Sequence, residues 1–314
     1  MADENVLVTG GAGFIGSHLV QRLVSEGYKV RVLDNLIRST TTRIQPLIDD
    51  GKVEFIDGDV RYEDAVNKAI DGIDYVFHEA AVCINRSIAH PKESMDINLN
   101  GSHNVFRAAL DNGVKRVVFA SSASVYGAPE KLPMSESDDL KPITPYCVAK
   151  LSSEYLLKFF ARQGLEYNVL RYFNVYGVGQ KTDAYYTSVI IKFIKRLLAG
   201  EAPLISGDGS QSMDFVNVLD IVEANMLAMK SETKNEVMNV GSGTSVSIKE
   251  LADIITKDLG LDIEPEYLKR EVIVKERRAD VSKIKKLLGF EPKVSIDEGL
   301  AMLVEDIKKN PQLY

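Results

Sequence analysis

Tyr146 and Lys150 stand four residues apart, shortly after Pro145. On a helix that begins after this proline, the spacing places both side chains on one face. A phenol is a poor base at neutral pH because its ordinary pKa is about 10. A neighbouring lysine ammonium favours the phenolate, so the pair predicts a tyrosine that can act as a general base.

The motif SSASVYG at residues 121–127 supplies a third polar group. It follows an apolar run at 116–120, which predicts a buried strand. In parallel α/β sheets, ligands bind beyond the carboxyl ends of the strands. Ser122 is therefore placed to hold a substrate hydroxyl beside Tyr146, and we expect Ser122, Tyr146 and Lys150 to be catalytic.

Three glycines, Gly10, Gly13 and Gly16, follow the first expected strand and open a helix. Gly10 allows a tight turn, Gly13 lets the backbone approach a pyrophosphate, and Gly16 lets helix and strand pack closely. Asp34 ends the next strand, where its carboxylate can bind a ribose hydroxyl. The cofactor-binding residues expected in this part are Gly10, Gly13, Phe14, Ile15, Gly16, Asp34 and Asn35. The pattern predicts a dinucleotide site.

The Asp34 carboxylate would repel a 2′-phosphate, which favours NAD over NADP, although Arg31 or Arg38 could accommodate that phosphate. A second carboxylate, Asp59, follows the third expected strand. We expect it to accept a hydrogen bond from the adenine amino group while Val60 packs on the ring. The alternative is that Asp59 caps a helix N-terminus.

Short apolar runs alternate with longer helical patterns over the first two thirds of the chain. Strands are expected at 5–9, 29–33, 53–56, 75–78, 116–120 and 167–170, and helices at 18–26, 93–111 and 146–163. This alternation predicts a doubly wound α/β domain with a parallel sheet. We expect this domain at residues 1–175, rejoined by about 214–240, and a smaller mixed α/β substrate lobe mainly at 176–314.

The length of 314 residues predicts about two domains. Because Asp and Glu outnumber Lys and Arg by 45 to 38, the net charge is −7, which argues against nucleic acid and anionic membranes as partners. The longest uncharged stretch, 5–21, is too short to span a bilayer. Cys83 and Cys147 lack metal-ligand spacing, so no metal site is expected. Two such cysteines fit a reducing compartment, and we expect the cytoplasm.

Eight motifs occur in the order found in extended short-chain dehydrogenases/reductases. They are GGAGFIG (10–16), Asp34, GDV (58–60), FHEAA (77–81), SSASVYG (121–127), YCVAK (146–150), RYFNVYG (171–177) and GDGSQSMDFVNVLD (207–220). The chain is similar to the branch of NAD-dependent nucleotide-sugar epimerases and dehydratases that includes UDP-glucose 4-epimerases. The resemblance implies a Rossmann-type fold, NAD as cofactor, a UDP-sugar substrate and a homodimer built on four helices.

The resemblance also implies a mechanism. The Tyr146 phenolate removes the proton of the sugar 4-hydroxyl while the C4 hydride moves to NAD. The 4-keto sugar then turns over and takes the hydride back on its other face, so the net reaction is an isomerisation. Ser122 shares the hydrogen bonds of the hydroxyl, and Lys150 favours the phenolate and binds the nicotinamide ribose.

Further site residues are carried over from the same resemblance. Ala80, Ala81 and Asn98 are expected at the cofactor, together with Tyr172 on its nicotinamide side. The two arginines, Arg86 and Arg270, are expected to bind the substrate diphosphate. The full set of expected substrate contacts is Arg86, Ser122, Ser124, Tyr146, Phe173, Asn174, Val189 and Arg270. The alternatives are ordinary ones: packing for the alanines and aromatics, helix capping for Asn98, and solvated surface charge for the arginines.

The choice of substrate depends on positions where the chain departs from its relatives. Related dehydratases and decarboxylases carry carboxylates where this chain has Ala123 and Ser124, which favours a 4-epimerase over a 4,6-dehydratase. Met213 replaces a diphosphate-binding arginine, and Ser206 replaces an aromatic that stacks on uracil. Arg277 occupies a position whose size in relatives decides whether an N-acetyl group fits.

The expected order of substrates is therefore UDP-glucose and UDP-galactose first, then UDP-glucuronate, because Arg277 could bind a carboxylate, and then UDP-N-acetylglucosamine. A non-catalytic NAD-sensing protein on the same fold is the remaining alternative.

Overall fold

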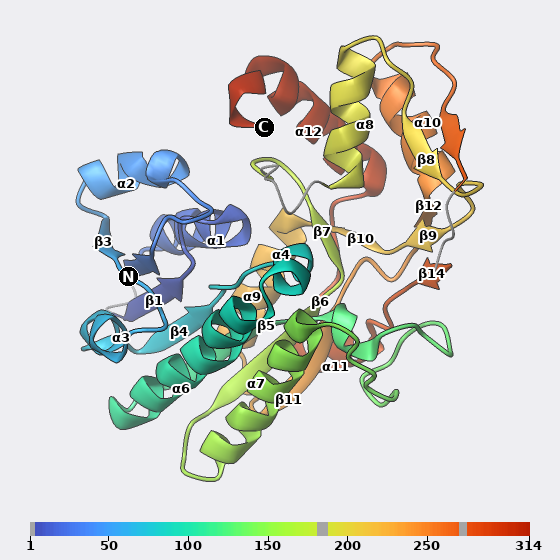
Figure 1. The fold of residues 1–314 in the computed structure, drawn as a ribbon. Coiled ribbons are helices and arrows are strands. Elements are labelled where there is room, and N and C mark those ends of the chain that lie inside the picture. The colour runs from blue at the N-terminus through green and yellow to red at the C-terminus, as the bar shows by residue number, and fades with distance from the viewer. Residues whose placement is uncertain (1–3, 181–187, 270–274) are drawn as a thin grey trace. The chain divides into compact units, whose positions relative to one another are not determined.

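The computed structural model describes residues 4–180, 188–269 and 275–314, which form two compact units (Figure 1). Unit 1 combines Met1–Val125, Leu140–Arg171 and Val222–Met238; unit 2 combines Tyr126–Asp139, Tyr172–Ile221 and Asn239–Tyr314. This division differs from the expected boundary at 175. The segment 126–139 belongs to unit 2, and the segment that returns to unit 1 begins at 222 rather than about 214.

Unit 1 is built on a seven-stranded sheet in the order β11-β6-β5-β4-β1-β2-β3. Its strands are β1 (Asn5–Thr9), β2 (Lys29–Asp34), β3 (Val53–Asp57), β4 (Tyr75–His78), β5 (Arg116–Ser122), β6 (Tyr167–Tyr172) and β11 (Glu236–Val240). The pairings of β1 with β2 and β4, of β2 with β3 and of β4 with β5 are parallel. The strand order reverses at β1, which has β2 on one side and β4 on the other. The predicted doubly wound Rossmann-type fold is confirmed.

The helices of unit 1 are α1 (Phe14–Ser25), α2 (Gln45–Asp49), α3 (Glu63–Ile70), α4 (Ile84–Ala89), α5 (Pro91–Met95), α6 (Ser102–Asp111), α7 (Pro145–Ala161) and α9 (Val218–Lys230), the last starting in unit 2. Helices α3, α6 and α7 bury a common core against the sheet, which includes Phe106, Phe119 and Phe160. Helices α1 and α9 lie side by side, joined by ion pairs from Arg22 to Glu223 and from Lys230 to Glu26.

The helix expected at 93–111 is present, with a π-helical segment in its middle. Between α5 and α6 the chain forms a π-helical segment, η2 (Asp96–Gly101). Gly101 lies against Val60, and an added Cβ there would stand 2.6 Å from Val60 Cγ2. Segments of π-helix occur often at functional sites, and this one carries Asn98.

Unit 2 is the smaller mixed α/β lobe that was expected. Its strands are β7 (Asn174–Tyr176), β8 (Leu204–Ser206), β9 (Ser212–Met213), β10 (Phe215–Asn217), β12 (Val246–Ser247), β13 (Glu266–Leu268) and β14 (Glu276–Arg277). Its helices are α8 (Val189–Leu198), α10 (Ile248–Asp258), α11 (Ser282–Leu288) and α12 (Ile296–Lys309). Helices α8, α10 and α12 share one apolar core.

Local signals explain where the helices of unit 2 begin. Capping boxes start α10 at Ser247 with Glu250 and α12 at Ser295 with Glu298. Asp214, fully buried between β9 and β10, accepts backbone N–H bonds from Ser242, Gly243 and Ala279. It thereby ties three segments of the lobe together. Within the described residues of both units, no helix has the length and apolar character needed to cross a bilayer.

Candidate active site

The glycine loop between β1 and α1 forms a cradle that only glycine permits. Gly10 has a φ of +72°, and an added Cβ would stand 2.7 Å from the Ala80 nitrogen. A Cβ at Gly16 would stand 2.3 Å from the Gly10 oxygen. Gly13, the N-cap of α1, offers no side-chain cap to the first turn. The N–H groups of that first turn thus receive no side-chain cap and can bind an anion, which fits a dinucleotide pyrophosphate.

Asp34 lies at the carboxyl end of β2 and fastens the glycine loop. Its carboxylate accepts hydrogen bonds from the Ala12 nitrogen at 3.1 Å, the Leu36 nitrogen at 2.9 Å and the Ser39 hydroxyl at 2.8 Å. These bonds fix the carboxylate next to the loop. The position suits an acceptor for a ribose hydroxyl.

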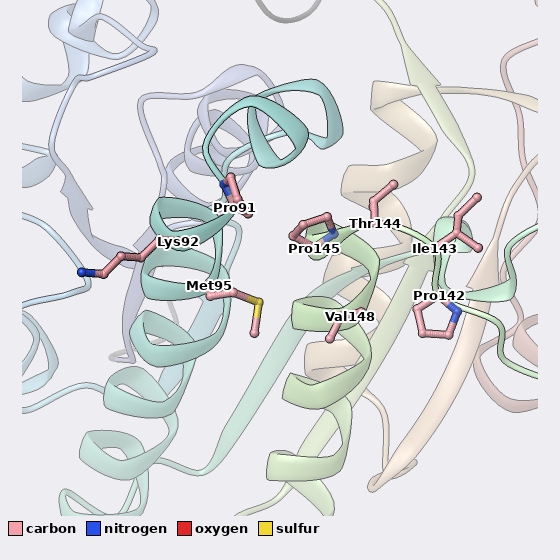
Figure 2. A pocket seen from close by; sticks show the side chains of 8 residues that line it. All are labelled: Pro91, Lys92, Met95, Pro142, Ile143, Thr144, Pro145 and Val148. Carbon is pink, nitrogen blue, oxygen red and sulfur yellow. The ribbon is translucent and has the colours of Figure 1, made fainter.

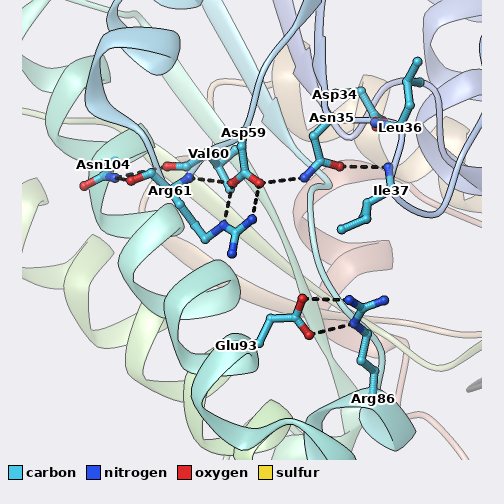
Figure 3. A network of polar contacts seen from close by, with 10 residues as sticks. All are labelled: Asp34, Asn35, Leu36, Ile37, Asp59, Val60, Arg61, Arg86, Glu93 and Asn104. Carbon is cyan, nitrogen blue, oxygen red and sulfur yellow. Dashed lines mark hydrogen bonds and ion pairs between the residues drawn. The ribbon is translucent and has the colours of Figure 1, made fainter.

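Asp59 lies after β3 in a polar network with Asn35 and Arg61 (Figure 3). Arg61 donates to both carboxylate oxygens, at 3.0 and 2.7 Å, and Asn35 donates at 2.7 Å. Burial opposes ionisation of Asp59, but the bonds from Arg61 and Asn35 and the charge of Arg61 together outweigh it and hold the pKa of this carboxyl below its ordinary value. The alternative of a helix cap does not apply, because the N-cap of α3 is Tyr62.

Asn98 is fully buried and supports the segment that follows β4. Its amide oxygen accepts from the Val82 nitrogen at 2.9 Å, and its amide nitrogen donates to the Val82 oxygen at 3.2 Å and to Ser94 at 3.1 Å. These bonds hold the backbone around Ala80 and Ala81, whose cofactor contacts remain predictions. In the structure, the Asn98 side chain thus supports the backbone that follows β4.

The role of His78, at the end of β4, was not predicted. Its ring is fully buried, with Nδ1 2.6 Å from Thr9 Oγ1 and Nε2 2.9 Å from Ser102 Oγ. Burial, assisted by the charge of Lys150, lowers the pKa of His78 to about 3. His78 therefore links β1, β4 and α6 as a neutral ring.

Acid should destabilise the protein through His78. Below pH 6.5 the unfolded chain protonates this ring, whereas the folded ring stays neutral down to about pH 3. We expect His78 alone to lower the free energy of unfolding by about 2 kcal/mol between pH 7 and pH 5. Urea unfolding at both pH values, compared with His78→Gln, measures this difference. The exposed His103 gives the control His103→Gln, which should keep the full loss; an equal loss in His78→Gln would contradict the assignment.

Helix α7 starts where the sequence predicted and carries the tyrosine and lysine. The Thr144 side chain accepts from the Cys147 nitrogen at 3.3 Å, and Pro145 occupies the first turn, where its missing N–H costs nothing. Cys147 is buried, with its sulfur 2.9 Å from the Thr144 hydroxyl, as expected for a small packed residue.

Lys150 is 2% exposed and lies beside Tyr146 at the carboxyl end of β5. Its Nζ donates to the Ala120 oxygen at 2.7 Å and stands 5.9 Å from the centre of the Tyr146 ring. Burial lowers the pKa of Lys150 to about 8, against the opposing effect of Glu79 and Glu154. The structure thus brings Lys150 and Tyr146 together next to the strand that ends in Ser122.

Ser122 accepts two hydrogen bonds from Ser124. The Ser124 hydroxyl donates at 2.9 Å and its backbone nitrogen at 3.2 Å, both to Ser122 Oγ. With its oxygen occupied as an acceptor, Ser122 is left to donate its own proton to another group.

The other predicted substrate residues, and Tyr172, which was predicted at the cofactor, are described within their own units. In unit 1, Arg86 makes a bidentate ion pair with Glu93 at 2.7 and 2.8 Å (Figure 3). In unit 2, Tyr172 and Phe173 are buried, Asn174 donates to the Asp214 oxygen at 2.9 Å, and Val189 begins α8. Arg270 lies outside the described residues. These assignments remain predictions.

Arg277 on β14 pairs in register with Met213 on β9. Its guanidinium donates to the Gly127 oxygen at 2.8 Å. A large cationic side chain is thus fixed beside the position where relatives carry a diphosphate-binding arginine. Among the described residues, no group of three His, Cys, Asp or Glu side chains could hold a metal ion.

Comparison with known proteins gives consistent matches. The family model described as the NAD dependent epimerase/dehydratase family matches residues 6–241. The UDP-N-acetylglucosamine 4-epimerase of Methanobrevibacter ruminantium M1, solved with UDP-N-acetylmuramic acid, is 38% identical with a TM-score of 0.93, and the match covers 99% of this chain and 100% of that chain. The UDP-glucose 4-epimerase of Thermotoga maritima, solved with UDP-glucose, is 38% identical with a TM-score of 0.91, covering 98% and 99%.

A related enzyme of a different activity matches as well. The UDP-N-acetyl-alpha-D-glucosaminuronate decarboxylase of Bacillus cytotoxicus is 34% identical over 316 residues, which cover 96% of this chain and 97% of that protein.

Proposed function

Because the chain belongs to the NAD-dependent epimerase/dehydratase family, we propose that it is a NAD-dependent 4-epimerase of UDP-sugars, with UDP-glucose and UDP-galactose as preferred substrates. The observation that carries the proposal is the Tyr146–Lys150 pair beside the end of β5, with no carboxylate at the two positions after Ser122. The proposed catalytic residues are Ser122, Tyr146 and Lys150.

The cofactor cradle fits NAD. The uncapped N-terminus of α1 suits the pyrophosphate, Asp34 the adenosine ribose, and the Asp59 network the adenine. Lys150 is proposed to bind the nicotinamide ribose. When bound, NAD supplies the reversible oxidation that inversion at C4 requires.

The chain's own residues manage the proton. Tyr146 in its phenolate form accepts the proton of the sugar 4-hydroxyl, and the buried Lys150 ammonium stabilises that phenolate. Ser122, whose oxygen already accepts from Ser124, donates a hydrogen bond to the sugar oxygen and keeps its own proton. When the ketone is reduced on its other face, Tyr146 returns the proton. No net oxidation occurs, so the enzyme is proposed to be an isomerase.

The competing activities need an acid that this site lacks. Elimination or decarboxylation in related enzymes uses carboxylates one or two residues beyond the catalytic Ser or Thr. Here Ala123 has no polar group, and the Ser124 hydroxyl is engaged with Ser122. This favours epimerisation over 4,6-dehydration.

Among sugars, Arg277 guides the ranking. Its half-buried side chain is held by the Gly127 oxygen, so it is not simply extended into solvent. A fixed bulky group at this position disfavours an N-acetyl substituent, and its charge keeps UDP-glucuronate as the second candidate.

The direct test is to incubate the purified protein with UDP-galactose and to follow the formation of UDP-glucose. Interconversion supports the proposal. A parallel screen with UDP-glucuronate, UDP-N-acetylglucosamine and dTDP-glucose ranks the substrates. A keto product that absorbs in alkali would show a dehydratase instead, and no turnover of any nucleotide sugar would refute the proposed activity.

We further propose that the protein is a homodimer. Val148, Tyr155 and Phe159 form an apolar stripe on α7 and are 39%, 58% and 56% exposed. At the N-terminal end of this stripe lies a pocket of about 530 Å³, lined by α5, by residues 142–144 and by the start of α7. Met95 and Val148 both line it (Figure 2). Such an exposed apolar surface suits a second copy of the chain.

Charges placed on the stripe should separate the subunits. We expect the double variant Tyr155→Lys/Phe159→Lys to run as a monomer by light scattering at micromolar concentration, where the parent runs as a dimer. Lys68→Glu, a charge change at an exposed position of α3, should remain dimeric. A parent protein that is monomeric under these conditions would rule out the homodimer.

The proposed location is the cytoplasm. Both cysteines, Cys83 and Cys147, are free thiols, as is usual in a reducing compartment.

A further inference from the structure

A buried ion pair lies one helical turn beyond Lys150. Glu154 on α7 and Arg171 on β6 are joined by two hydrogen bonds, from Nε at 3.0 Å and from Nη2 at 2.6 Å. Their side chains are only 2% and 4% exposed. Taking both charges out of water is costly, and apolar residues of similar volume often serve stability as well. Stability alone therefore does not account for this pair.

Ser121 completes the network. Its hydroxyl donates to Glu154 Oε1 at 2.6 Å, so one carboxylate connects α7 with both β5 and β6. Ser121 directly precedes Ser122, and Glu154 follows Lys150 by four residues, which places the two on the same face of α7. The network is thus connected to β5 and α7, the two elements that carry the proposed catalytic residues.

The surroundings of Lys150 show why a nearby anion matters. The groups that face it are Tyr146 and Glu154 on α7, the neutral His78 on β4, and Glu79 directly after β4. Glu154 also carries the positive charge of Arg171 from β6 as its ion-pair partner. Burial removes most of the water that would stabilise an ammonium, and Glu79 and Glu154 are the anions that oppose this effect. The position of Glu154 is fixed by two further residues, Ser121 and Arg171.

We propose that Glu154 is a positioning residue for the Tyr146–Lys150 pair: anchored by Ser121 and Arg171, its carboxylate keeps Lys150 in the ammonium form beside Tyr146. The catalytic role of this positioning rests on the proposed function, in which Tyr146 and Lys150 are catalytic. The charge relation between Glu154 and Lys150 does not depend on any substrate.

The test is a direct titration of Lys150 in the cofactor-free protein. Lysine labelled with carbon-13 at Cε reports its protonation by NMR, and Lys150→Arg identifies the signal. Glu154→Gln keeps the size of the side chain but removes its charge. We expect the Lys150 midpoint to fall by roughly one pH unit. In the enzyme assay, the alkaline limb of kcat should move to lower pH by a similar amount, with KM little changed. An unchanged Lys150 midpoint would overturn the proposal.

The matched control is Glu166→Gln. Glu166, which directly precedes β6, also pairs with an arginine of β5, Arg116 at 3.2 Å, but at the opposite end of the strands from Lys150. It should alter thermal stability without moving the Lys150 midpoint, whereas an equal shift in this variant would overturn the specific role of Glu154. If Glu154→Gln does not fold because Arg171 is left without a carboxylate, Glu154→Gln/Arg171→Gln is titrated instead. Because this variant also removes the opposing charge of Arg171, the Lys150 midpoint should fall by less than in Glu154→Gln, and an unchanged midpoint would overturn the proposal.

The two proposals can fail separately. Absence of UDP-sugar turnover by the parent protein refutes the proposed function, while the NMR titration still measures the effect of Glu154. Conversely, if the parent protein is active but the Lys150 midpoint is the same in Glu154→Gln, the proposed function stands and the positioning role of Glu154 is refuted.

Discussion

Tyr146→Phe is expected to lower kcat for UDP-galactose by about 10²–10⁴-fold, the range that a positioned general base contributes. The phenyl ring can stay beside Lys150, whose Nζ is 5.9 Å from the ring centre, so only the proton acceptor is lost. NAD binding, measured by calorimetry, should therefore change little. Initial rates across a range of substrate concentrations should show the loss in kcat rather than in KM.

Tyr155→Phe is the matched control, since Tyr155 lies on the same helix with its side chain 58% exposed. It should keep the activity of the parent. If Tyr146→Phe also retains kcat within about threefold of the parent, Tyr146 is not the general base.

Gly16→Ala should have the second largest effect, on cofactor binding and on stability together. The added Cβ would stand 2.3 Å from the Gly10 oxygen and 2.8 Å from the Gly11 Cα, and backbone atoms cannot rotate away. The start of α1 must shift, which moves the N–H groups proposed to bind the pyrophosphate. We expect a loss of about 1–3 kcal/mol in the free energy of unfolding. NAD affinity should fall by about 10²-fold, since about 2.7 kcal/mol of contacts at the helix N-terminus corresponds to that factor.

Gly58→Ala provides the comparison, because its Cβ would meet the end of a flexible side chain, Leu33 Cδ1, at 2.8 Å. That contact can relax by a change of rotamer, so the loss of stability should be smaller. Calorimetric titration with NAD and thermal unfolding measure both variants. An unchanged NAD affinity in Gly16→Ala would show that the loop does not hold the cofactor.

The strands and the main helices of unit 1 were predictable because their signals are local. Runs such as Val6–Val8 and Val117–Phe119 are fully buried on both sides of a covered sheet, which leaves them without polar alternation. Thr144 and Pro145 determine the start of α7 within a few residues. The π-helical segment Asp96–Gly101 inside the predicted helix was missed, since the contact of Gly101 with Val60 and the bonds of Asn98 to Val82 that accompany it are revealed by no local pattern.

At the site, spacing was enough to predict that Tyr146 and Lys150 lie together, since both belong to one helix. The partners of charged groups were not predictable. The ion pairs of Arg61 with Asp59 and of Arg86 with Glu93 depend on how the chain folds, and neither was expected. His78 gave one usable signal, a histidine inside an apolar strand, which points to a buried and uncharged ring.

The hydrogen bond from the Ala12 nitrogen to Asp34 links nicotinamide-cofactor preference to the stiffness of the glycine loop. Exchange of Asp34 for a neutral or basic residue, the usual first step toward accepting a 2′-phosphate, would also release the loop that is proposed to cradle the pyrophosphate. The preference for NAD over NADP and the affinity for the cofactor would thus both depend on the Asp34 carboxylate. A variant that accepts NADP would need a second substitution that restores an acceptor for Ala12.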